Sequence, residues 1–161
     1  MPPSMTDAVT VHIDAPPGAV WGLVADVTQI GRFSPETFEA EWIAPSTGPE
    51  PGARFRGHVK RNERGPTYWT TCEVQRCAPG EVFSFGVVTG GKVLNVWSYE
   101  MEPDGEGTKV TESFALADTP AMRLYWTLLG RFRGKRNRND MRRTLEAIKA
   151  VAEADAAGGG A

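Results

Sequence analysis

The sequence contains little cysteine and little histidine, with two residues of each among 161. In a single strand Cys72 and Cys77 would lie about 16 Å apart, at about 3.3 Å per residue, which is too far for a disulfide. His12 and His58 alternate with apolar residues in expected strands, so both should face solvent. Two histidines cannot supply the three ligands of a His-based zinc site. The sequence therefore predicts free thiols and no metal site.

Several longer signals are also missing. No apolar run approaches the roughly 18 residues that a membrane-spanning helix requires, and residues 1–10 lack the basic start and apolar centre of a signal peptide. No Gly-x-Ser-x-Gly motif, P-loop or dinucleotide-binding fingerprint occurs, so common hydrolase, phosphate and nicotinamide chemistries have no local support. We therefore expect a cytoplasmic protein that uses no cofactor.

Charge is distributed unevenly along the chain. The net charge is −2, but residues 131–143 carry +6, which leaves −8 for the remainder. Within this stretch four cations recur at helical spacing, and we call them the basic patch: Arg131, Lys135, Arg138 and Arg142. Three interpretations stay open. The patch is a solvated helix face, a surface for transient contact with nucleic acid or an anionic membrane, or a lid whose arginine holds a ligand carboxylate or phosphate.

The hydrophobic pattern changes period twice. Residues 9–14 alternate like a strand, and prolines at the start of the next apolar run suit the first turn of a helix. A second short helix is expected near residues 34–37. Period two then returns, interrupted by turns, and predicts six strands: 38–44, 53–62, 67–77, 81–88, 93–101 and 108–116.

From residue 121 the period becomes 3.6, which predicts one long C-terminal helix. Gly130 and Gly134 mark either a kink in this helix or a close approach to the sheet. The expected fold is α+β, with a seven-stranded curved antiparallel sheet wrapped around the long helix, two short helices after the first strand, and an internal cavity. We expect one domain over residues 9–155, a disordered N-terminus over 1–8 and a flexible tail over 156–161.

The order of elements and several local motifs resemble the START-related helix-grip superfamily (SRPBCC). This superfamily includes lipid-transfer, pollen-allergen-like and polyketide cyclase/dehydrase proteins, and this chain is similar to an actinobacterial-looking branch. The motifs are APPGAVW at 15–21, VADVT at 24–28, FSPE at 33–36, GARFRG at 52–57 and VTES at 110–113. The resemblance implies a hydrophobic ligand held between the sheet and the C-terminal helix.

Aromatic and apolar side chains on the inward positions are the candidate ligand-binding residues, because aromatic walls with few polar groups suit a small-molecule pocket. The alternative is a filled core, since any such sheet needs apolar side chains on one face. The candidates are Trp21, Phe33, Phe55, Phe83, Phe85, Trp97, Tyr99, Phe114, Tyr125, Trp126, Leu129, Met141 and Leu145.

Glu112 stands out because it lies between Val110 and Phe114 at strand period two, on the apolar face. A buried carboxylate must be paired, hydrogen-bonded or protonated. One interpretation is a cavity acid that acts with Tyr99 or Tyr125 as a catalytic group. The other is a structural ion pair with an arginine, for which the candidates are Arg76, Arg138 and Arg142.

Three functions remain open from the sequence. The first is binding of a hydrophobic or aromatic, lipid-like or polyketide-like molecule. The second is a cofactor-free cyclase or dehydratase that uses the Glu and Tyr side chains. The third is a nucleic-acid-acting or toxin-like protein that works through the basic patch.

Overall fold

The computed structural model describes residues 6–60 and 65–158, with the side chains of residues 130–134 excepted. Its elements are β1 (Thr6–Ile13), α1 (Pro17–Ala25), the 3-10 helix η1 (Val27–Arg32), β2 (Thr37–Trp42), β3 (Arg54–Lys60), β4 (Thr67–Ala78), β5 (Val82–Thr89), β6 (Lys92–Asp104), β7 (Gly107–Leu116) and α2 (Pro120–Gly158).

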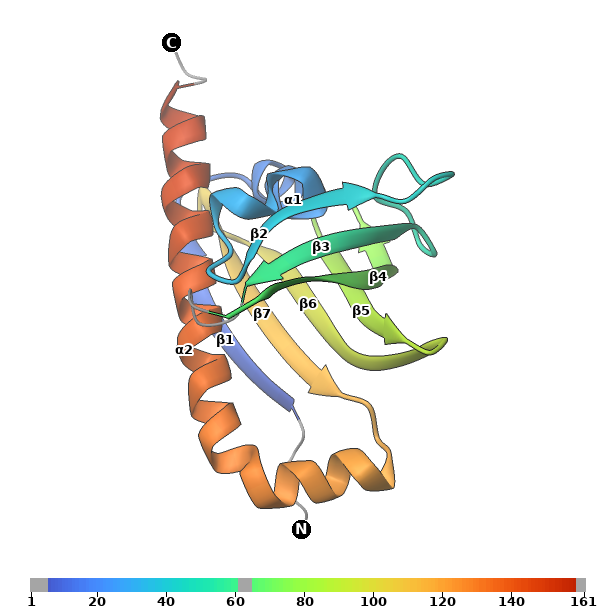
Figure 1. Ribbon diagram of the computed structural model, residues 1–161. Coiled ribbons are helices and arrows are strands. Elements are labelled where there is room, and N and C mark those ends of the chain that lie inside the picture. The colour runs from blue at the N-terminus through green and yellow to red at the C-terminus, as the bar shows by residue number, and fades with distance from the viewer. Residues whose placement is uncertain (1–5, 61–64, 159–161) are drawn as a thin grey trace.

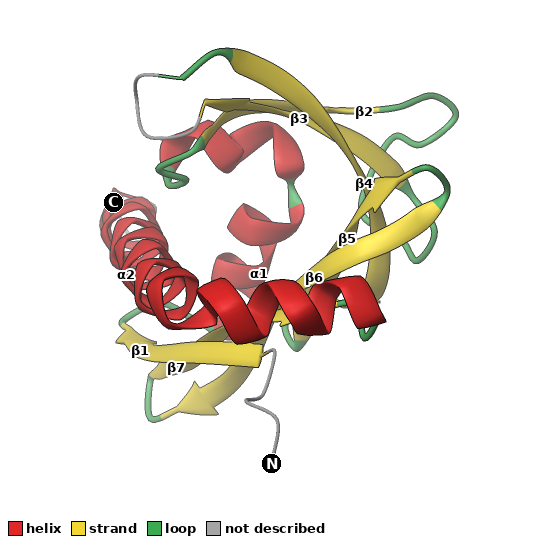
Figure 2. Cartoon of the chain, turned by 60° about the horizontal axis from the view of Figure 1, so that its bottom comes forward, coloured by secondary structure: helices red, strands yellow, loops and turns green. Residues whose placement is uncertain are grey.

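The strands form one seven-stranded sheet in the order β1-β7-β6-β5-β4-β3-β2, with every neighbouring pair antiparallel. The sheet curls strongly, and α2 lies along the open side between its edge strands β1 and β2 (Figure 2). In Figure 1, α1 and η1 lie at the end of the sheet opposite the first turns of α2. The expected α+β helix-grip fold is confirmed.

Local chemistry explains the two short helices. Pro17 begins α1, where its missing N–H has no partner to lose. The Asp26 side chain caps η1 by accepting a hydrogen bond from the Thr28 N–H at 3.1 Å. The second short helix therefore lies at 27–32 rather than near 34–37. At residues 34–37 the chain instead makes a turn into β2, in which the Ser34 hydroxyl accepts a hydrogen bond from the Thr37 N–H at 3.0 Å.

Both ends of the described chain are more regular than expected. Thr6 and Ala8 pair with Ala115 and Ser113 of β7, so residues 6–8 are strand rather than disordered terminus. The pairing with β7 satisfies the backbone N–H and C=O groups of these residues. The apolar pattern is too short here to predict that the strand begins at residue 6. At the other end α2 continues to Gly158, so residues 156–158 are helical.

Helix α2 is unbroken from Pro120 to Gly158, but it bends sharply within its orange first half (Figure 1). Gly130 and Gly134, which were expected to mark either a kink or a close approach to the sheet, belong to this half, and sharp helix kinks occur at glycine-containing sites. The bend separates two segments, and we call residues 120–129 the first and residues 135–158 the second. The first segment crosses one end of the sheet, and the second packs on β1 (Figure 2).

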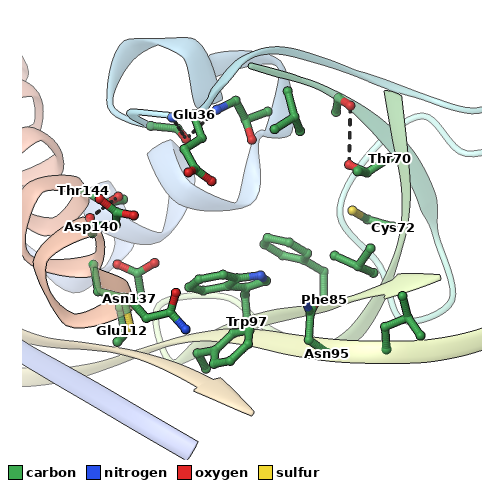
Figure 3. Close-up of a pocket in the computed structure, with 18 of the residues that line it drawn as sticks. Glu36, Thr70, Cys72, Phe85, Asn95, Trp97, Glu112, Asn137, Asp140 and Thr144 are labelled. Atoms are coloured by element: carbon green, nitrogen blue, oxygen red, sulfur yellow. Dashed lines mark hydrogen bonds between the residues drawn. The ribbon is translucent and has the colours of Figure 1, made fainter. Parts of the chain in front are cut away.

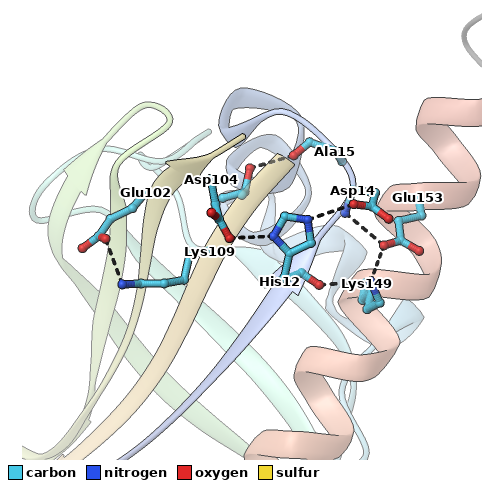
Figure 4. A network of polar contacts seen from close by, with 9 residues as sticks. His12, Asp14, Ala15, Glu102, Asp104, Lys109, Lys149 and Glu153 are labelled. Atoms are coloured by element: carbon cyan, nitrogen blue, oxygen red, sulfur yellow. Dashed lines mark hydrogen bonds and ion pairs between the residues drawn. The ribbon is translucent and has the colours of Figure 1, made fainter. Parts of the chain in front are cut away.

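The second segment of α2 is held by both apolar and polar contacts. Its inward stripe, Met141, Leu145, Ile148 and Ala152, is buried in the core. At the surface, the Lys149 ammonium donates to the His12 carbonyl at 3.0 Å, and Glu153 accepts the Asp14 N–H at 2.9 Å (Figure 4). These hydrogen bonds to backbone fix the position of the helix along β1.

Candidate functional site

A cavity of about 430 Å³ lies between the concave face of the sheet and α2. Strands β3 to β7 supply one wall, the η1–β2 connection a second, and both segments of α2 a third. Figure 3 shows side chains from these three walls pointing into the same space. This volume falls in the usual range for small-molecule pockets, roughly 300–1,000 Å³.

An aromatic belt crosses the middle of the sheet wall. Phe85, Trp97 and Phe114 are direct cross-strand partners on β5, β6 and β7. The Trp97 and Phe114 ring centroids are 4.7 Å apart, and Phe55 of β3 meets Phe85 edge to face at 5.2 Å. We call these four residues the aromatic belt. Such rings offer a flat apolar ligand a large contact area.

A buried acid lies beside the aromatic belt, two residues further along β6 and β7. Tyr99 and Glu112 are cross-strand partners, and the Tyr99 hydroxyl donates to Glu112 Oε1 at 3.0 Å. The Glu112 residue is only 3% exposed. Burial raises the pKa of the Glu112 carboxyl to about 8; the Tyr99 hydrogen bond opposes this rise and the charge of Asp140 adds to it. Glu112 is therefore mainly protonated at neutral pH.

No arginine of the described chain neutralises this acid. Arg138 instead pairs with Asp7 at 2.7 Å, and Arg76 pairs with Glu100 at 3.1 Å. Glu112 Oε2 is buried without a hydrogen-bond partner among the described residues. The expected alternative of a structural ion pair is therefore replaced by a neutral acid held by a tyrosine.

A second polar group lies on the other side of the belt. Asn95 of β6 lines the cavity, and its Oδ1 is also buried without a partner among the described residues. Figure 3 shows Trp97 between Glu112 and Asn95.

Cys72 also lines the cavity. Burial raises the pKa of its thiol to about 12, so Cys72 is not a nucleophilic thiolate at neutral pH.

With this geometry in place, known proteins can be compared. The family model "Polyketide cyclase / dehydrase and lipid transport" matches residues 7–153. The chain belongs to this family. It is 33% identical to the solution structure of the Polyketide_cyc-like protein Cgl2372 from Corynebacterium glutamicum, over 95% of this chain and 88% of that one, with a TM-score of 0.53.

Two further solved structures share the fold at low identity. Protein NE0264 from Nitrosomonas europaea is 14% identical, with coverage of 98% and 99% and a TM-score of 0.70. The di-domain ARO/CYC StfQ from the steffimycin biosynthetic pathway is 13% identical, with a TM-score of 0.68 over 95% of this chain and 52% of StfQ. The comparison with curated proteins gave no match.

In this family member, most of the sequence-predicted ligand residues line the cavity. They are Phe55, Phe85, Trp97, Tyr99, Phe114, Tyr125, Trp126 and Met141. Glu112, Tyr99 and Tyr125, the predicted catalytic group, all line the cavity, and the Tyr99 hydroxyl donates a hydrogen bond to Glu112.

Five predicted ligand residues lie outside the lining. Phe33, Phe83 and Leu145 are buried in the core. Trp21 packs between α1 and β5, where its indole N–H donates to the Val82 carbonyl at 3.0 Å. Leu129 is 48% exposed. Alternation identifies the inward face of an element, but it does not separate cavity from core along that face.

The polar lining was largely missed by sequence reasoning, although a signal for it exists. Asn95 lies two residues before Trp97 and four before Tyr99, and this spacing predicts that all three face inward. On α2, Asn137 and Thr144 lie at helical spacing from Met141, Asp140 lies at helical spacing from both, and all line the cavity. Searching inward positions for polar as well as aromatic residues would have found these groups.

The basic patch is largely solvent-facing. Lys135, Arg138 and Arg142 are exposed, and Arg131 lies outside the residues whose side chains are described. Arg136, which was not assigned to the patch, lines the cavity and lies 4.0 Å from Asp140. In the described ranges, no group of three or more metal-ligating side chains comes together, and no helix is long and apolar enough to cross a membrane.

Proposed function

We propose that this protein binds a hydrophobic, aromatic small molecule in the cavity between the sheet and α2. The observation that carries the proposal is the cavity itself, walled by the aromatic belt and by polar side chains that can orient a ligand. The family description, which combines polyketide chemistry with lipid transport, supports the same ligand class. The two free cysteines suit the reducing cytoplasm, the compartment in which we propose that the protein acts.

Native mass spectrometry of the purified protein, followed by analysis of its organic extract, tests ligand binding directly. A matched pair of variants controls for non-specific association. Val87 lines the cavity, whereas the adjacent Val88 does not. We expect Val87→Trp to lose a co-purifying molecule that Val88→Trp retains. Equal retention by both folded variants would contradict binding in this cavity.

A second candidate function is a cyclase or dehydratase, favoured by the neutral Glu112 beside Tyr99 and by the fold shared with the ARO/CYC protein StfQ. In a dehydration, Glu112 would protonate the departing hydroxyl, while the Asp140 carboxylate on the facing helix would accept the proton from the neighbouring carbon. A carbon–oxygen bond breaks, a carbon–carbon double bond forms and water leaves.

This reaction can be followed with a defined probe, 1,3-diphenyl-3-hydroxypropan-1-one, whose dehydration gives a conjugated enone with a new absorbance band. We expect the enzyme to produce the enone, and Glu112→Gln to abolish turnover while probe binding changes little. An unchanged rate in Glu112→Gln would refute catalysis by Glu112. Binding without turnover in the native protein would favour the carrier role.

We further propose that ligand transfer occurs at an anionic membrane surface through the start of α2. This segment exposes Leu124 and Leu128, which are 62% and 69% exposed, shortly before the exposed cations of the basic patch. Met122, Tyr125 and Trp126 of the same segment line the cavity. Apolar side chains beside cations are the pattern that binds anionic membrane interfaces.

Vesicle sedimentation distinguishes this proposal from nucleic-acid binding. We expect binding to vesicles that contain phosphatidylserine, weaker binding to pure phosphatidylcholine, and a loss in Lys135→Glu/Arg142→Glu. Lys60→Glu/Lys92→Glu, at exposed positions on β3 and β6, serves as the charge-matched control. Arg138 is avoided because its reversal would oppose Asp7. Salt-sensitive binding to RNA but not to vesicles would overturn the membrane proposal.

A further inference from the structure

The register of the sheet places the polar groups of the cavity at two separate levels. Asn95, Trp97 and Tyr99 alternate along β6 and share its inward face. Tyr99 pairs with Glu112, so the acid level is four residues along β6 from the Asn95 level. At about 3.3 Å per residue the two levels are about 13 Å apart. The aromatic belt lies midway between them.

Each level holds an oxygen that lacks a partner. Glu112 Oε1 accepts from Tyr99, so the proton of the neutral acid resides on Oε2, which has no acceptor among the described residues. Asn95 Oδ1 similarly has no donor. Leaving such buried groups unpaired is unfavourable. The terminal torsions of Asn and Glu are broad, so a modest rotation can present each group to a ligand.

We propose that the cavity selects an elongated, neutral aromatic molecule with a polar group at each end: an acceptor that meets Glu112 and a hydroxyl that meets Asn95. Its flat body lies on the aromatic belt. This selectivity rests on the proposed ligand-binding function. A phenolic hydroxyl satisfies either end, because it both donates and accepts. Neutrality is favoured by the lining, which has two acids, Glu36 and Asp140, against one cation, Arg136, so an anionic ligand gains no net attraction.

Three probes of one carbon frame test the two ends: trans-4,4′-dihydroxystilbene, 4-hydroxystilbene and trans-stilbene. Binding to the native protein is measured by quenching of tryptophan fluorescence. We expect affinity to fall about five- to tenfold with each hydroxyl removed.

Variants assign the two ends. Asn95→Ala should bind the dihydroxy and monohydroxy probes equally, whereas Asn139→Ala, an exposed position on α2, should preserve the difference. Glu112→Gln should retain the pattern because its amide can accept from Tyr99 and donate to the probe. Glu112→Leu should lose the affinity that one hydroxyl of the dihydroxy probe contributes.

The outcomes separate the two proposals. Equal, measurable affinity for all three stilbenes would overturn selection by two polar ends and leave cavity binding intact. No binding of any of the three stilbenes would overturn both. The comparison of probes on the native protein requires no variant, so it holds even if a substitution prevents folding.

Discussion

Glu112 is an acid that folding moves from water into an apolar wall. In the folded protein it lies in an apolar wall with a single hydrogen bond to Tyr99, and its pKa rises to about 8. In the unfolded chain its pKa returns to the ordinary value of 4.5. Between these two values the folded state binds a proton that the unfolded state releases.

This difference predicts a pH-dependent loss of stability. Below about pH 4.5 both states are protonated and Glu112 has no effect. As pH rises from about 4.5 to 8, the unfolded state gains by ionising, so native stability falls by up to about 1.4 kcal/mol per pH unit. Above pH 8 the loss levels off. The Gln side chain of Glu112→Gln cannot ionise. We therefore expect the free energy of unfolding of this variant to rise relative to that of the native protein as pH increases from about 4.5 to 8.

Urea denaturation at several pH values between 4.5 and 9 measures the difference. Glu146→Gln, an exposed position on α2, is the control and should follow the native profile. If the profiles of Glu112→Gln and the native protein run parallel, then Glu112 is ionised in the folded state. The neutral-acid assignment would then be wrong.

At the scale of elements, simple periodicity predicted most of the fold. The two-residue spacing of Phe83 and Phe85, and of Trp97 and Tyr99, correctly predicted which side chains lie on the inward face of the sheet. Periodicity could not place the second short helix, because Asp26 starts η1 through a side-chain cap rather than an apolar stripe. It also missed the polar lining, whose residues match the inward spacing but not the apolar composition.

The two segments of α2 should respond differently to truncation. Leu145 of the second segment is fully buried, whereas Leu129 of the first is 48% exposed. We expect Leu145→Ala to lower the free energy of unfolding by about 2–5 kcal/mol, and Leu129→Ala to change it by less than about 0.5 kcal/mol. Chemical denaturation of both variants measures this contrast. Equal losses would mean that the first segment packs into the core as firmly as the second.

At the scale of the whole molecule, core and cavity share one apolar face of the sheet. The core extends from the place where the second segment of α2 packs with β1 and α1, through residues such as Val20 and Ile148. It continues into the cavity wall, where Phe55, Phe114 and Met141 belong to both. Sequence could predict a concave apolar face, but it could not divide that face into core and cavity. That division depends on the curvature of the sheet and the bend of α2.

A ligand that occupies this cavity only in the native state must stabilise the whole fold. At a free concentration of one hundred times its Kd, a single-site ligand adds about 2.7 kcal/mol. For a chain of this length, that corresponds to a rise in Tm of about 5–11 °C. Thermal unfolding with and without trans-4,4′-dihydroxystilbene measures the rise, and Val87→Trp, whose indole enters the cavity, should show little. A similar rise in Val87→Trp would place the binding site elsewhere on the molecule, because the added ring occupies the volume that the ligand requires.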